Sequence, residues 1–144
     1  MTTSPARCRT RPLLLAAAAL LAGLGLVACG GSDDAGTPAD CRTVAPGADG
    51  TTKVTVVGKN LAFDASCLQV RPGRLVVTFR NEDGGVAHDF HVTGHGVNAS
   101  TALAPGAVTQ RLTVELTEPG RYTFACDPHA TMEGTLVVSE PRAS

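Results

Sequence analysis

The sequence has no tryptophan, one tyrosine and four phenylalanines, so aromatic residues make up only 3% of its 144 residues. It also lacks a strong charge, because 12 basic and 13 acidic residues leave a formal net charge of −1. Nucleic-acid-binding proteins usually carry a basic face, so this balance argues against that class. The length allows one small domain and excludes a multidomain enzyme.

Long apolar runs are also missing, except near the N-terminus. There Arg7, Arg9 and Arg11 precede an apolar run at residues 13–22, which is typical of an export signal. The segment Val27-Ala28-Cys29 resembles the lipobox of bacterial lipoproteins. This resemblance implies a signal peptide at residues 1–28 and a lipidated Cys29 on the outer face of the cell membrane, or on the periplasmic side of the envelope. The alternative is an ordinary secretory signal that happens to contain a cysteine.

The segment after the cysteine has almost nothing to bury. Residues 29–52 are rich in Gly, Pro, Ser, Thr and Asp, which is typical of a flexible tether. The folded domain is expected at residues 53–139, followed by a short tail at 140–144. Gly30, the residue after the candidate lipid site, does not by itself identify the membrane that retains the protein.

Valine dominates the part that must fold. The chain after residue 28 has 14 Val and 7 Leu, and β-branched residues favour strands. Turn signals such as Arg71-Pro72-Gly73 separate short alternating segments. Strands are predicted at 53–57, 68–70, 75–81, 88–93, 108–116, 121–126 and 133–139. This pattern predicts an antiparallel sandwich or barrel.

Strand alternation indicates where the reactive side chains point. Cys126 shares its face with Tyr122 and Phe124, which is the inward face. By the same rule His88 points inward, and Asp89 and His91 point to the opposite side.

Four possible metal ligands stand out. Cys126, His129 and Met132 lie within seven residues, between two predicted strands, and His88 is the distant inward histidine. A thiolate, two imidazoles and a weak thioether are the donors that select copper in a trigonal site with an axial methionine.

The motif Tyr-x-Phe-x-Cys-x-Pro-His at residues 122–129, followed by Met-x-Gly at 132–134, resembles the signature of the cupredoxins, the type 1 blue copper proteins. The Cys-x2-His-x2-Met spacing is similar to that of amicyanin rather than plastocyanin, and segments 60–64, 70–81 and 81–92 also look plastocyanin-like. The resemblance implies an all-β Greek-key β-sandwich of about seven to eight strands. It also implies one copper ion, cycling between Cu(I) and Cu(II), with His88, Cys126, His129 and Met132 as ligands.

Two residues depart from the family pattern. Asp89 follows the first ligand histidine, where the family commonly has Asn, and Asp127 follows the cysteine, where it has Ser or Thr. If the two carboxylates approach each other, repulsion raises the pKa of one of them, or a cation lies nearby.

Other interpretations of these residues were weighed. Cys126 and Met132 could be an ordinary buried thiol and a core side chain. A zinc site built from His88, His91, Cys126 and His129 is not expected, because residues 88 and 91 face opposite sides of a strand. His91 and His95 are expected to be exposed, or to contact the ligand residues without binding the metal themselves. Asn98-Ala99-Ser100 matches the pattern for N-glycosylation. In a protein with a bacterial export signal, this match is expected to have no function.

The five cysteines then have separate expected fates. Cys8 leaves with the signal, Cys29 takes lipid and Cys126 takes copper. Export places the remaining pair in a compartment that permits disulfides, so a bridge between Cys41 and Cys67 is predicted.

The leading hypothesis is a monomeric, membrane-anchored electron carrier, with His129 as the ligand nearest solvent. Its partners would be envelope redox proteins such as a cytochrome c, a dehydrogenase or a terminal oxidase. The alternative is a copper-delivery or copper-homeostasis lipoprotein with no electron transfer role. An enzyme is not expected, because a binuclear CuA centre needs two ligand cysteines, and multicopper enzymes need more histidines and a second domain.

Overall fold

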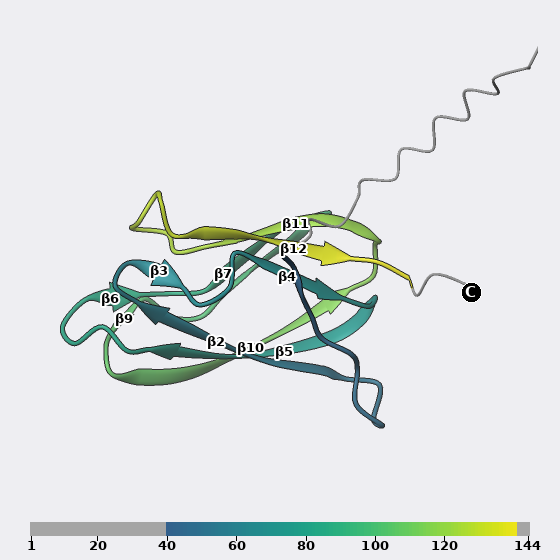
Figure 1. Ribbon diagram of the computed structural model, residues 1–144, viewed down its shortest axis with the longest axis horizontal. Coiled ribbons are helices and arrows are strands. Elements are labelled where there is room, and N and C mark those ends of the chain that lie inside the picture. The colour runs from purple at the N-terminus through teal and green to yellow at the C-terminus, as the bar shows by residue number, and fades with distance from the viewer. Residues whose placement is uncertain (1–39, 141–144) are drawn as a thin grey trace, which may run out of the picture. The chain divides into compact units, whose positions relative to one another are not determined.

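The computed structural model describes residues 40–140, and its regular elements in that range are all strands (Figure 1). No helix in this range is long and apolar enough to cross a membrane. The expected signal peptide at 1–28, the expected lipid site Cys29 and tail residues 141–144 lie outside the described residues.

Eight of the strands between residues 40 and 140 contain four or more residues, in agreement with the seven to eight expected. They are β2 (Thr52–Lys59), β4 (Cys67–Val70), β5 (Gly73–Asn81), β7 (His91–Gly94), β8 (Val97–Ser100), β10 (Val108–Leu116), β11 (Gly120–Ala125) and β12 (Glu133–Val138). Four further strands contain two residues each: β1 (Arg42–Thr43), β3 (Ala62–Phe63), β6 (Ala87–His88) and β9 (Ala104–Pro105).

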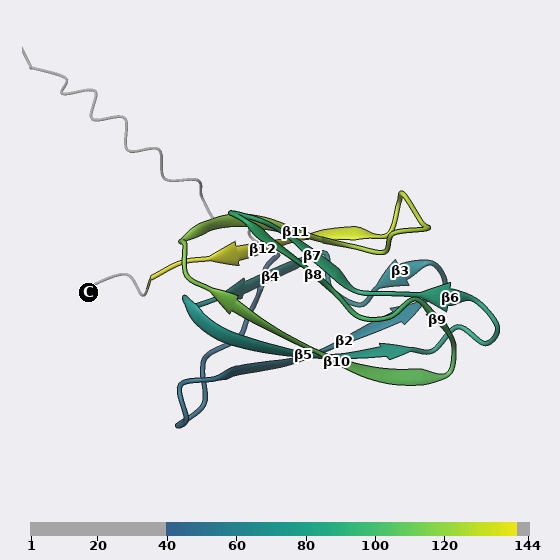
Figure 2. The same cartoon turned by 180° about the vertical axis from the view of Figure 1, so that it is seen from behind.

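The strands form two main sheets that pack as the layers of a Greek-key β-sandwich (Figures 1 and 2). One sheet has the order β1-β4-β12-β11-β7-β8 and the other the order β10-β5-β2-β3, while β6 and β9 pair separately. Three pairs are parallel, namely β1 with β4, β4 with β12, and β2 with β5. The expectation of an antiparallel sandwich therefore holds for the other strand pairs but not for these three. The chain leaves the second sheet for β4 and returns at β5, and such a crossover allows β2 and β5 to run in the same direction.

Alternating burial along the strands builds the core. In β2, for example, Val54 and Val56 are buried while Lys53 and Thr55 are exposed. All four phenylalanines of the chain gather in one cluster between the sheets, with centroid distances of 5.1 to 6.0 Å between neighbouring rings. The members are Phe63, Phe79, Phe90 and Phe124. Four of the five aromatic residues of the sequence are thus concentrated in one place.

The strand predicted at 88–93 is interrupted. Its first part, β6, pairs with β9, and its second part, β7, pairs with β8 and β11. Asp89 and Phe90 lie in the break, and both are buried. Strand alternation predicted that Asp89 and His91 share the side opposite His88, and Asp89 does group with His91 and Asp127 rather than with His88. Its burial was not predicted, because the chain changes partner strands between His88 and His91. The hairpin partner β8 was not predicted, since Val-Asn-Ala-Ser is a weak strand pattern.

The folded part begins earlier than Lys53. Strand β1 pairs with β4, and Cys41 is joined to Cys67 by the predicted disulfide. The Arg42 guanidinium donates hydrogen bonds to the Asp64 carboxylate at 3.2 Å and to the Thr55 carbonyl at 2.9 Å. Residues 41–43, expected to belong to the tether, are therefore attached to the sandwich.

Candidate metal centre

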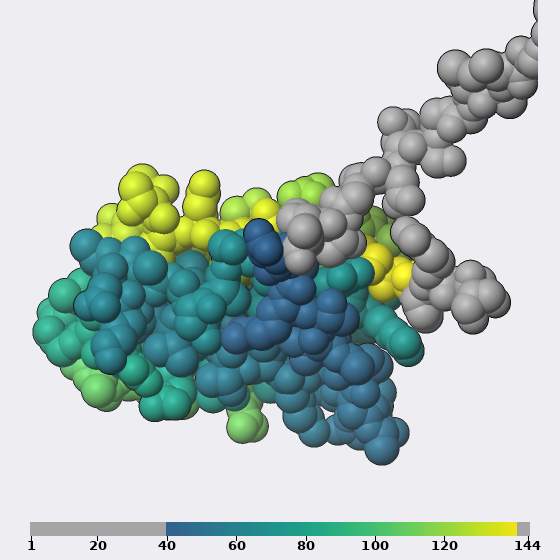
Figure 3. Space-filling model, viewed as in Figure 1, coloured from purple at the N-terminus to yellow at the C-terminus, as the bar shows by residue number. Residues whose placement is uncertain are grey.

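Three of the four predicted ligands lie in the connection between β11 and β12, which stands out from one end of the sandwich (Figures 1 and 3). The His129 N–H donates to the Cys126 carbonyl at 3.1 Å, and the Met132 N–H donates to the His129 carbonyl at 2.8 Å. The Cys126 N–H donates to the Met132 carbonyl at 2.9 Å and closes the loop. These three bonds fold the segment back on itself, so that its side chains can converge.

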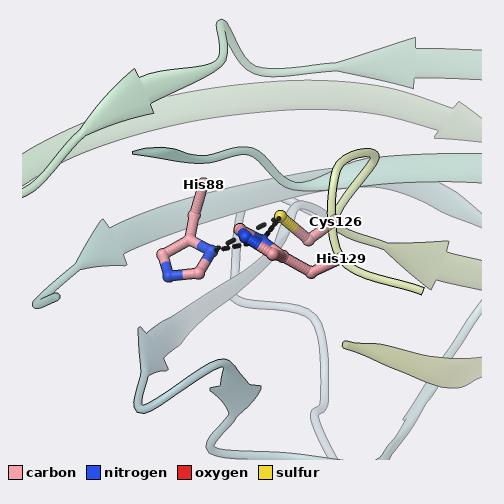
Figure 4. A group of neighbouring side chains, drawn as sticks. All are labelled: His88, Cys126 and His129. Carbon is pink, nitrogen blue, oxygen red and sulfur yellow. Dashed lines mark hydrogen bonds between the residues drawn. The ribbon is translucent and has the colours of Figure 1, made fainter. Parts of the chain in front are cut away.

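The fourth predicted ligand, His88, ends β6 and comes from the other side of the site. Strand β6 and its partner β9 lie at the same end of the sandwich as the β11–β12 loop (Figures 1 and 2). The His88 ring faces Cys126 and His129 (Figure 4). Residues that are far apart in the sequence therefore meet at one point.

The donor atoms form a compact triangle. The two histidine Nδ1 atoms lie 3.1 Å apart, and the Cys126 Sγ lies 3.4 Å from Nδ1 of His88 and 3.3 Å from Nδ1 of His129. The centre of such a triangle is about 1.9 Å from each donor atom. Zinc, which is similar in size to copper, binds protein nitrogen and sulfur ligands at about 2.0 to 2.3 Å, so the spacing is close to that of a metal site. The three donor atoms are therefore spaced so that they could hold one ion.

The chemistry of these donors agrees with their geometry. One soft thiolate and two imidazoles in a plane, with a methionine in the same loop, form the donor set of a trigonal copper centre. His88, Cys126 and Met132 are each at most 2% exposed, whereas His129 is only partly buried. This group of side chains fits one type 1 copper ion. His129 offers the most direct contact with solvent among the four.

Met132 lies close to Gly58 of β2 and to the Phe79 ring. A Cβ atom added to Gly58 would lie 3.0 Å from the Met132 Cε and 3.0 Å from the Phe79 ring. The missing side chain of Gly58 therefore leaves the space that Met132 and Phe79 fill.

The Cys126 thiol is protonated in the absence of a metal. Burial raises its pKa to about 11, although a hydrogen bond from the Asp89 backbone N–H acts in the opposite direction. A cysteine binds metal as the thiolate, so metal binding here must displace this proton.

Asp83 contacts His88 on the side away from the triangle, and the sequence analysis did not identify it. His88 Nε2 donates to Asp83 Oδ2 at 2.9 Å. The same carboxylate accepts the backbone N–H groups of Asn60 at 2.7 Å and Leu61 at 3.1 Å. These two bonds, followed by the one from His88, lower the pKa of Asp83 to about 2. The only signal in the sequence was its place in the turn Glu82-Asp83-Gly84-Gly85, which is typical of a loop.

The two aspartates beside the ligands, Asp89 and Asp127, both accept hydrogen bonds from neighbouring groups. Asp89 Oδ1 accepts the Asp127 backbone N–H at 2.8 Å. The His91 Nδ1 donates to Asp127 Oδ1 at 2.7 Å, and its Nε2 donates to Asn98 Oδ1 at 2.6 Å. The hydrogen bond to Asp127, followed by the one to Asn98, raises the pKa of His91. His91 is therefore the side chain beside the two carboxylates that can supply the cation expected there.

The zinc alternative does not match this arrangement. His91 groups with Asp89 and Asp127, whereas His88, Cys126 and His129 form a separate group. His95 is exposed in the β7–β8 turn, and its ring lies against Tyr122 at a centroid distance of 4.8 Å, with the two ring planes tilted by 40°. Neither of these histidines faces the donor triangle.

Comparison with known proteins identifies relatives of the whole domain. A family model described as a cupredoxin-like domain matches residues 18–138. Auracyanin A, a "blue" copper protein from Chloroflexus aurantiacus, is 22% identical and superposes with a TM-score of 0.55 over 62% of this chain and 100% of its own. Rusticyanin from Thiobacillus ferrooxidans is 22% identical, with a TM-score of 0.55 over 67% and 82% of the two chains. A copper-containing nitrite reductase from Thermus scotoductus is 26% identical with a TM-score of 0.52, and the match covers 69% of this chain but only 28% of that enzyme.

Proposed function

Because the chain belongs to the cupredoxin-like domain family, we propose that it is a membrane-anchored type 1 copper protein that carries single electrons between redox proteins of the cell envelope. The observation that carries this proposal is the triangle of His88 Nδ1, Cys126 Sγ and His129 Nδ1. Bound copper would supply the one-electron chemistry between Cu(I) and Cu(II). The protein would hold the ion with these three residues, and Met132 would be a fourth, weaker ligand.

The surroundings of the ligands favour a redox site over an open ion-transfer site. His88 is fixed by Asp83, and the β11–β12 loop is closed by its own backbone bonds. A ligand set that is held in place reorganises little when the charge of its ion changes, whereas handing over an ion requires the ligands to open. Asp89 and Asp127 each direct one carboxylate oxygen to a neighbouring N–H group rather than to the donor triangle.

The end of the sandwich that carries the ligands also exposes apolar side chains. Leu61, Val86 and Leu103 are 36 to 55% exposed, and they come from the connections that flank β3, β6 and β9 (Figure 1). We propose that a redox partner docks on this end, close to His129. Scattered apolar contacts of this kind suit a brief encounter, since transient redox interfaces are small.

The anchor is the part of the proposal that depends on the sequence alone. If Cys29 carries lipid and residues 30–40 behave as their Gly-rich composition predicts, these 11 residues give a root-mean-square reach of about 18 Å. Such a reach would let the domain meet partners in the same membrane. Mass spectrometry of the exported protein tests this part, because a chain starting at Cys29 must carry a diacylglycerol.

Electron exchange tests the function itself. We expect the reduced copper protein to reduce a soluble cytochrome c of higher potential in a stopped-flow experiment, with one electron transferred per copper. Transfer of Cu(I) to a metal-free oxidase domain, without electron exchange, would instead favour copper delivery and contradict the proposal.

A further inference from the structure

Asp83 is placed to act on the metal centre through His88. His88 is fully buried, and its Nε2 lies 2.9 Å from Asp83 Oδ2. A carboxylate oxygen only accepts, so the Nε2 atom carries a proton, and in the neutral ring the Nδ1 atom then keeps its lone pair. This lone pair faces Cys126 and His129. The Asp83 contact therefore selects the tautomer in which His88 can bind a metal through Nδ1.

The carboxylate is itself held firmly. It accepts the N–H groups of Asn60 and Leu61, both of which have left-handed backbone angles, with φ of 54° and 58°. The Asp83 backbone N–H donates to Asn81 Oδ1 at 2.9 Å, and Asn81 is 1% exposed. The side chain of Asp83 is only 13% exposed. A negative charge is thus fixed about one imidazole width from the donor triangle.

We propose that Asp83 is a positioning residue that fixes His88 for copper and lowers the reduction potential of the bound ion. A carboxylate that accepts the second ring N–H of a ligand histidine makes the imidazole a stronger donor. Its negative charge also favours the more highly charged Cu(II) over Cu(I). This inference rests on the proposed function, because it requires His88 to bind copper.

The test compares Asp83→Asn with the wild-type protein in a spectroelectrochemical titration of the copper-loaded full chain. We expect the variant to lose about tenfold in Cu(II) affinity, the lower end of the range for loss of such a partner, and to lose less in Cu(I) affinity. A tenfold loss confined to Cu(II) corresponds to a rise of about 59 mV in reduction potential. The matched control is Asp64→Asn. Asp64 also accepts a backbone N–H, that of Val57 at 2.8 Å, but it pairs with Arg42 and not with a ligand. A potential of Asp83→Asn that is unchanged, lowered or no higher than that of the control would overturn the inference.

A second measurement does not depend on whether the variant folds. In the metal-free wild-type protein, nitrogen NMR is expected to show His88 protonated at Nε2, with slow exchange of this proton. Protonation of His88 at Nδ1 instead would overturn the inference. The two proposals also fail separately. A wild-type protein without a thiolate-to-copper absorption band contradicts the proposed function, whereas an intact band with an unaltered potential in Asp83→Asn contradicts only the role of Asp83.

Discussion

His91 Nδ1 lies 2.7 Å from Asp127 Oδ1 and links β7 to the residue that follows the ligand cysteine. Asp89, His91 and Asp127 offer atoms that all lie within 4.8 Å of one another. Two carboxylates at this distance would repel each other, but the protonated imidazole compensates for them. This ion pair therefore stabilises the strand next to the metal loop without being part of the donor triangle.

His91→Gln is expected to lower the stability of the metal-free protein in a pH-dependent way. The pKa of His91 is raised in the folded state, first by Asp127 and then by Asn98. Its contribution is fully present below the unfolded pKa of about 6.5 and is lost as the pH rises through the higher folded value. The pair is partly solvated, so the difference at pH 5 should not exceed about 1 kcal/mol.

Urea unfolding of the wild-type protein and of His91→Gln, at pH 5 and pH 9, measures the difference in their stability. His95→Gln is the control, because His95 lies in the neighbouring turn and its ring lies against Tyr122. A stability loss in His91→Gln that grows as the pH rises would contradict the assignment of a protonated His91.

Gly58→Ala tests the packing beneath the metal loop. The new methyl group would come within 3.0 Å of Met132 and of the Phe79 ring. Overpacking of this kind typically costs about 1 to 3 kcal/mol. Denaturant unfolding is expected to show such a loss, and the visible spectrum of the copper-loaded variant is expected to change because Met132 must move.

Gly84→Ala is the matched control, since an added Cβ there would meet nothing within 4 Å. Equal stability and identical spectra for the two variants would show that Met132 is not confined by Gly58.

Removal of the disulfide tests how the N-terminal edge is attached. Cys41 and Cys67 are 26 residues apart in sequence, and a bridge that closes a loop of this size contributes about 2 to 4 kcal/mol. The paired variant Cys41→Ser with Cys67→Ser is expected to unfold at correspondingly lower urea concentration. The intact mass of the wild-type protein should rise by two hydrogens on reduction. No mass change would contradict the bridge.

Three of the four predicted ligands could be grouped from the sequence because their spacing is local. Cys126, His129 and Met132 lie in one loop between two strands, and alternation along β11 places Cys126 on the inward face. The structure brings His88 to this loop, as strand parity and the family resemblance suggested.

The features that sequence reasoning missed depend on contacts between distant segments. Asp83 is an ordinary turn residue until the backbone of Asn60 and Leu61 and the ring of His88 converge on it. Likewise, Asp89 lies where the chain changes its partner strand, and it is buried there. Alternation within a single segment cannot reveal either event.

The visible and EPR spectra of the copper-loaded protein test the central claim most directly. Coordination by the Cys126 thiolate within a triangle with His88 and His129 predicts an intense thiolate-to-copper absorption band, which disappears on reduction and is absent in Cys126→Ser. The Cu(II) EPR signal should show the small hyperfine splitting of a type 1 centre. A protein that binds one copper ion but shows neither the band nor this signal would contradict the account.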